Sequence, residues 1–203
     1  KVLTGFRKYN VQAIINNPIW GFDHHLYVAG SSNGGSIHSP SESKVTAWRG
    51  DFRINPRTET FQPQSGSGRF GNTFDDWGNR FICNIRNPVI QVVLDHTSLA
   101  RNPLFAAPKA MIDSAEAGDQ LPIYRISPVE PWRELRAQQW TRDSSKQKLP
   151  RSELTGGGVF TSASGLTIYR GDQYGEKYAG QAFLGEVANN VIHRQEMTRD
   201  GVV

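Results

Sequence analysis

One local pattern recurs along this chain: aromatic and aliphatic residues stand on both sides of a short polar corner. The three segments that carry it are PIWGFDHHLYVAGSSNGGSIH, RFGNTFDDWGNRFICNI and AFLGEVANNVIHRQEM. Alternation of apolar and polar residues is typical of strands that bury one face. The corners hold Asp, Asn and Gly, which hydrogen-bond back into a turn or adopt the positive φ that a hairpin requires. The pattern therefore predicts an all-β chain built from antiparallel hairpins.

The spacing of the corners suggests a particular β architecture. Asp23 and Asp75, which close the first two Phe-Asp corners, lie about fifty residues apart. A β-propeller blade of four strands occupies roughly 40 to 50 residues. Between the corners, Phe52, Ile54 and Phe61 alternate around a turn at 55–58, as in the outer hairpin of a blade. The spacing therefore predicts a β-propeller segment.

Composition agrees with a folded, turn-rich protein. Ten Phe, six Tyr and five Trp among 203 residues exceed the aromatic content of disordered chains. Twenty Gly and eleven Pro favour many turns. The net charge of +4 comes from scattered basic residues, whereas nucleic-acid binding needs a denser basic stripe, so no nucleic-acid partner is expected. Cys83 is the single cysteine, and we expect it to be a small buried strand residue.

The pattern breaks in the middle of the chain. We predict propeller blades over 1–94, an insertion over 95–155 and a further blade over 156–203. The insertion is rich in Pro and charge, and a long segment without strands often covers a site. Within it, a proline at a first helical position precedes WRELRAQQW, which predicts a short helix near 131–141. No run of eighteen apolar residues occurs, so no membrane span is expected.

Four pieces of the sequence carry a family resemblance: DFRINP, FGNTFDDWGNRF, RNP and FTSASGLTIYRGDQYGEKYAGQAFLGEVANNVIHR. Together they resemble the β-propeller region of the planctomycete-type membrane-bound dehydrogenases, which are often fused to a c-type haem domain and are related to quinoprotein sugar dehydrogenases. The resemblance implies about three blades of a larger, six-bladed-type ring. It also implies an exported protein, periplasmic or extracellular, that needs the remaining blades to cover its open edges. Ser164 stands where this pattern often has cysteine, and the chain has no haem attachment motif.

The resemblance directs attention to residues that could serve a quinone-type cofactor. His24 and His25 are the candidate catalytic bases, because imidazole accepts a proton near neutral pH. Arg86, Arg101 and Arg170 are the candidate cofactor anchors, since their guanidinium groups suit the three carboxylates of pyrroloquinoline quinone. The alternative for the histidines is a solvent-exposed turn. For the arginines it is a salt bridge between loops, with Arg170 paired to one of the carboxylates at positions 172 and 176.

Asp75 and Asp76 are the candidate metal ligands, because Ca²⁺ prefers clustered oxygen ligands. An adjacent pair of carboxylates is also common in turns, and the corner DDWGN favours that alternative.

Two functions follow from these observations. The first is the propeller part of a dehydrogenase-like protein that oxidises a sugar or alcohol with a quinone-type cofactor, with Ca²⁺ as its possible metal. The second is a non-catalytic propeller scaffold that binds a glycan, a protein partner or a haem domain, with Trp48, Trp132 and Trp140 as stacking residues. Convergence of the three arginines and a histidine in one pocket favours the first function, and their dispersal favours the second.

Overall fold

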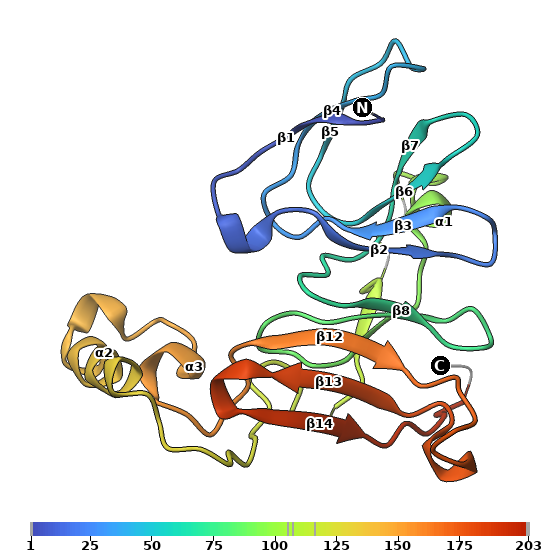
Figure 1. Cartoon of the computed structure of the whole chain (residues 1–203). Coiled ribbons are helices and arrows are strands. Elements are labelled where there is room, and N and C mark those ends of the chain that lie inside the picture. The colour runs from blue at the N-terminus through green and yellow to red at the C-terminus, as the bar shows by residue number, and fades with distance from the viewer. Residues whose placement is uncertain (1, 105, 107, 116, 202–203) are drawn as a thin grey trace.

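The computed structural model describes residues 2–104, 106, 108–115 and 117–201, and within them four antiparallel sheets form most of the regular secondary structure (Figure 1). The first sheet has the order β1 (Thr4–Phe6), β4 (Gly35–His38), β5 (Thr46–Trp48). The second has the order β2 (Asn16–Trp20), β3 (Leu26–Ala29), β6 (Phe52–Asn55), β7 (Thr60–Pro63). The third is β8 (Asn72–Phe74), β9 (Arg80–Ile82), β10 (Ile90–Val92), β11 (Met111–Asp113), and the fourth is β12 (Ala163–Ile168), β13 (Ala182–Glu186), β14 (Val191–Gln195). The prediction of a mainly β fold is confirmed, and the sheets of the described ranges close into neither a barrel nor a full ring.

The polar corners form the hairpin turns that the sequence predicts. The turn at 75–79 joins β8 to β9, and the turn at 56–59 joins β6 to β7. A 3₁₀ turn, η4 (Val187–Asn189), joins β13 to β14 and is capped by the next residue, Asn190, whose φ of 56° is left-handed. Local turn chemistry therefore decides where these strands reverse.

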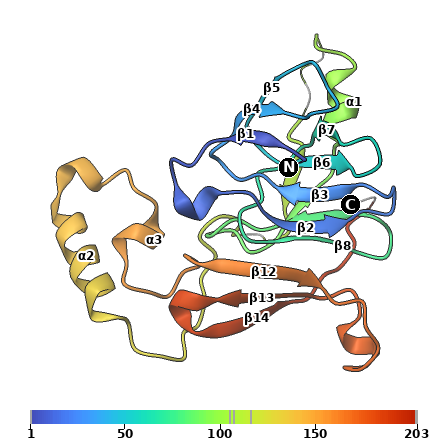
Figure 2. The same ribbon diagram turned by 45° about the horizontal axis from the view of Figure 1, so that its top comes forward.

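Three sheets meet through their first strands. β2, β8 and β12 lie side by side, with β8 between the other two (Figures 1 and 2). Gly71, just before β8, permits this approach: a Cβ there would lie 2.6 Å from both Cys83 Sγ and Leu166 Cβ. The hairpins thus extend outward from a shared line of first strands.

The helices are short and lie mostly in the middle of the chain. They are α1 (His96–Ala100), α2 (Pro131–Arg142) and α3 (Arg151–Leu154), with 3₁₀ turns η1 (Val11–Ala13), η2 (Ser144–Lys146) and η3 (Glu176–Tyr178). Pro131 is the first residue of α2, which begins where the sequence places a helix. β11 lies within 95–155, where the sequence pattern predicts no strand. No helix of the described ranges is long and apolar enough to span a bilayer.

Two apolar clusters form the core. One lies between the third and fourth sheets and contains Phe81, Cys83, Val89, Phe160, Ala163, Leu166, Ile168, Ala182 and Leu184. The other lies between the first and second sheets and contains Val28, Ile37, Phe52 and Phe61. The predicted burial of Cys83 is confirmed, and burial raises the pKa of its thiol to about 12.

A buried ion pair connects the second and third sheets. Arg80 Nη2 donates to Asp51 Oδ2 at 2.7 Å, and both side chains are almost fully buried. The other carboxylate oxygen of Asp51 accepts from the backbone N–H groups of Gly30 and Gly68, each at 2.9 Å. Arg80 also donates to Asn72 Oδ1 at 2.9 Å. Because both charges are hydrogen-bonded as well as paired, part of the cost of removing them from water is offset.

His193 on β14 is the basis of a pH prediction. Its ring meets that of Phe160 edge-on at 5.2 Å, its Nε2 is buried with no partner among the described residues, and burial lowers its pKa. Burial disfavours the protonated ring of His193 in the folded state. The neutral ring therefore makes its full contribution to the free energy of unfolding at pH values above the ordinary pKa of histidine. That contribution is lost as the pH falls through the folded-state pKa. We therefore expect the free energy of unfolding to decrease between pH 7.5 and 5.

Urea unfolding of the wild type and of His193→Leu over this pH range provides the measurement. The variant, which has no titrating ring there, is expected to show a smaller decrease. If the free energy of unfolding decreased equally with pH in the two proteins, folding would not lower the pKa of His193.

Candidate functional site

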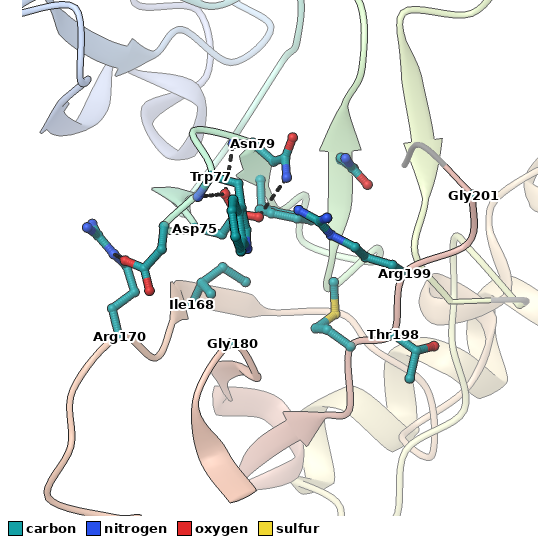
Figure 3. A pocket seen from close by; sticks show the side chains of 13 residues that line it. Asp75, Trp77, Asn79, Ile168, Arg170, Gly180, Thr198, Arg199 and Gly201 are labelled. Atoms are coloured by element: carbon teal, nitrogen blue, oxygen red, sulfur yellow. Dashed lines mark hydrogen bonds and ion pairs between the residues drawn. The ribbon is translucent and has the colours of Figure 1, made fainter. Parts of the chain in front are cut away.

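Two pockets lie at opposite ends of the first strands. The first, here called the turn-end pocket, has a volume of about 450 Å³ and lies where β8 and β12 end (Figure 3). Its walls are the 75–79 turn, Arg170 and the segment that follows β14 (Figure 3). The second, here called the helix-side pocket, has a volume of about 430 Å³ and lies where β8 and β12 begin, beside α2.

Asp75 lines the turn-end pocket, but its carboxylate is bound within its own turn. Oδ1 accepts from the backbone N–H groups of Trp77 at 2.9 Å and Asn79 at 2.8 Å, and Oδ2 accepts from Asn79 Nδ2 at 2.7 Å (Figure 3). The described residues contain no group of three or more His, Cys, Asp or Glu side chains that could hold a metal ion. The geometry at Asp75 is that of a turn-stabilising carboxylate.

Asp76 and Arg170 come together from corners far apart in the sequence. Arg170 Nε donates to Asp76 Oδ1 at 2.5 Å, and the guanidinium lies 5.2 Å from the ring centre of Phe22. The sequence interpretation that pairs Arg170 with a carboxylate of its own loop is wrong, because its partner belongs to the β8–β9 turn. Through these two contacts, Arg170 connects the end of β12 to the β8–β9 turn and to the β2–β3 turn.

The two candidate histidines lie in the β2–β3 turn. His24 is exposed and has a φ of 59°, a left-handed conformation. His25 Nδ1 lies 3.0 Å from the backbone oxygen of Asp23. The side chain of Asp23 also accepts from Arg53 Nη1 at 2.7 Å. Neither histidine lines the turn-end pocket.

The three candidate arginines are dispersed. Arg170 is at the turn end, whereas Arg86 follows β9 and pairs with Asp119 at 3.2 Å. Arg101 directly follows α1 and is exposed. Neither Arg86 nor Arg101 lines the turn-end pocket. The structure therefore brings together Asp75, Asp76 and Arg170, and it does not join them to the histidines or to the other two arginines.

The helix-side pocket combines aromatic, cationic and hydroxyl side chains. Its lining includes Trp132, Arg133 and Arg136 from α2 and, from the sheet side, Phe70, Thr161 and Ser162. Ser164, the position where the resembling proteins often have cysteine, also faces it.

The cationic wall of this pocket is held in place. Arg133 Nη1 donates to Thr161 Oγ1 at 3.2 Å, and Arg136 pairs with Glu153 on α3 at 3.1 Å. Both guanidinium groups pack on Trp132, at 4.9 Å and 5.3 Å from its ring centre. The Nε of Arg136 is buried and has no acceptor among the described residues.

A buried carboxylate, which the sequence reasoning missed, holds Ser162, a lining residue of the helix-side pocket. Glu186 at the end of β13 accepts from the backbone N–H of Ser162 at 2.7 Å and from Asn189 Nδ2 at 3.1 Å. Burial raises the pKa of Glu186, and these hydrogen bonds oppose that shift. The sequence does contain a signal for Glu186: it is an acidic residue that directly follows the apolar run AFLG and stands three residues before Asn189.

Comparison with known families gives one match. The model described as "Domain of unknown function (DUF7133)" matches residues 1–203, the full length of the chain. The chain belongs to the DUF7133 family. No curated protein and no solved structure matches the DUF7133 chain.

Proposed function

We propose that this DUF7133 chain is a propeller segment of a longer exported protein and that it binds a saccharide in its helix-side pocket without carrying out redox chemistry. Two features support the propeller. β8 to β11 form a consecutive four-stranded meander, as in a blade, and the first strands of three sheets lie side by side. The resemblance to dehydrogenase propellers supports an extracytoplasmic location and a fused haem domain as the companion of the segment.

The main support for the proposal is that the groups that quinone chemistry would need lie apart from one another. Asp76 and Arg170 are bonded to each other at the turn end, and Arg86 pairs with Asp119 elsewhere. The carboxylate of Asp75 is fully engaged by its turn. A quinone with several carboxylates needs convergent cations and a nearby base, and these residues do not provide that arrangement.

The chemistry of the helix-side pocket suits a sugar. An indole offers a flat apolar surface on which a pyranose ring packs, and hydroxyl and guanidinium groups bond its hydroxyls. Trp132 provides the indole and is about half exposed, at 53%. Thr161, Ser162 and Arg136 provide the polar groups.

The experiment is a pair of titrations on the intact protein. Calorimetry with oligosaccharides of glucose, xylose and galactose is expected to give saturable binding for at least one of them. Titration with pyrroloquinoline quinone and Ca²⁺, followed by cofactor absorbance and dye reduction with the same sugars, is expected to give neither saturation nor turnover. Saturable quinone binding with turnover would overturn the proposal in favour of a dehydrogenase.

A further inference from the structure

A second surface lies on the segment 124–155, here called the helical arm, and it shares Trp132 with the helix-side pocket. In both views α2 projects from the side of the sheets (Figures 1 and 2). The arm contains seven Lys and Arg residues and four Asp and Glu residues, so it carries a net charge of +3 out of the +4 of the whole chain. The rest of the protein is therefore close to neutral, and the arm is its main basic region.

The arm also exposes large apolar side chains. Of the twelve residues of α2 only Ala137 is buried, and Leu135 is 56% exposed. Just before α2, Tyr124 and Ile126 are exposed as well. A helix of this length is marginal in water, and helices in proteins are usually held by an apolar face packed on a core. α2 contacts α3 and η2, but it does not bury such a face on the sheets.

A series of cation–π contacts runs along α2, of which only Ala137 is buried. Arg136 lies between Trp132 and Trp140, at 5.3 Å and 4.8 Å from their ring centres. Arg133 packs on Trp132 at 4.9 Å, and Lys146 extends the series over Trp140 at 5.9 Å. Cation–π contacts of this kind stabilise local structure. Trp, Tyr and Arg in rigid positions are also the residues that dominate binding energy at protein interfaces.

We propose that the helical arm docks on an acidic surface of a partner protein. Leu135 and the indole of Trp132 form the apolar centre of the contact, and Arg142, Lys146 and Lys148 form its basic rim. An apolar centre with a charged rim is the ordinary anatomy of a protein interface. A second copy of this chain is disfavoured because the two basic arms would repel each other. Nucleic acid would use the charges but leave Leu135 without a role.

The test uses a fluorescent acidic peptide of about 20 residues, with Glu on most positions and Leu at helical i, i+3 and i+4 spacing. Anisotropy at ~0.15 M salt is expected to show saturable binding to the intact protein, weakened at least ~10-fold by Leu135→Ser. Arg142→Glu combined with Lys148→Glu is expected to weaken it by a similar factor. None of these three residues lines the helix-side pocket, so saccharide binding is expected to be unchanged in both variants.

The matched control is Arg7→Glu with Lys8→Glu, which makes the same charge change at two exposed residues outside the arm. It is expected to leave peptide binding within about twofold, because exposed distant charges are largely screened at this salt. Circular dichroism and thermal unfolding would establish that each variant is folded. Three results would overturn the proposal. The peptide would not bind, the control variant would lose as much peptide affinity as the arm variants, or polyglutamate or duplex DNA would bind as tightly as the amphipathic peptide.

Discussion

Replacement of Arg80 by methionine is expected to lower the free energy of unfolding by about 3–5 kcal/mol. Arg80 is the cation that compensates the buried carboxylate of Asp51, at 2.7 Å. Without it, Asp51 would keep its two backbone donors but no counter-ion in a site from which water is excluded. Arg80 also donates to the backbone oxygen of Ser65 at 2.9 Å, so its loss would release a loop. Urea unfolding followed by tryptophan fluorescence provides the measurement.

Two variants make this result specific. Arg170→Met removes the cation of an exposed ion pair and is expected to change stability by no more than about 1 kcal/mol. The double variant Asp51→Asn with Arg80→Met is expected to be more stable than Arg80→Met alone, because it leaves no uncompensated charge. A loss below about 1 kcal/mol for Arg80→Met would contradict this role of the ion pair.

Truncation of Phe160 to alanine is expected to cost a similar amount, about 3–5 kcal/mol. Phe160 is fully buried, although it lies outside every strand, and it belongs to the core between the third and fourth sheets. Its backbone N–H donates to the oxygen of Leu121 at 3.0 Å, which ties the central segment of the chain to the fourth sheet. Its removal would leave a cavity where these parts meet.

Chemical unfolding of Phe160→Ala is compared with that of Tyr124→Ala. Tyr124 is an aromatic residue of the same part of the chain, but it is 91% exposed, so its loss is expected to change stability by at most about 0.5 kcal/mol. If the two variants lost similar amounts of stability, Phe160 would not be a core residue.

The hairpins were predictable because their determinants are local. Asp75 and Asn79 bond each other across one turn, and Asn190 supplies a left-handed residue in another, so a short stretch of sequence contains all that each turn requires. Pro131 likewise predicts the start of α2. The packing of the sheets was not predictable in this way. Arg170 bonds Asp76 across 94 positions, and only the tertiary fold brings that pair together.

In the candidate site, too, local features could be predicted from the sequence and tertiary contacts could not. Arg86 was predicted either to anchor a cofactor or to tie loops by a salt bridge, and its pairing with Asp119 agrees with the second alternative. The helix-side pocket has no sequence motif, because Phe70, Trp132 and Thr161 come from three distant segments. Trp132 was recognised as an aromatic residue available for stacking. The pocket around Trp132 could be identified only from the structure.

The most direct test of the proposed function compares two tryptophans that line opposite pockets. Trp132 belongs to the helix-side pocket, and Trp77, which is 75% exposed, belongs to the turn-end pocket. Calorimetry with the glucose, xylose and galactose oligosaccharides is made on the wild type, on Trp132→Ala and on Trp77→Ala. We expect at least ~10-fold weaker binding, about 1.4 kcal/mol, for Trp132→Ala and unchanged binding for Trp77→Ala. Loss of binding in Trp77→Ala with none in Trp132→Ala would contradict it.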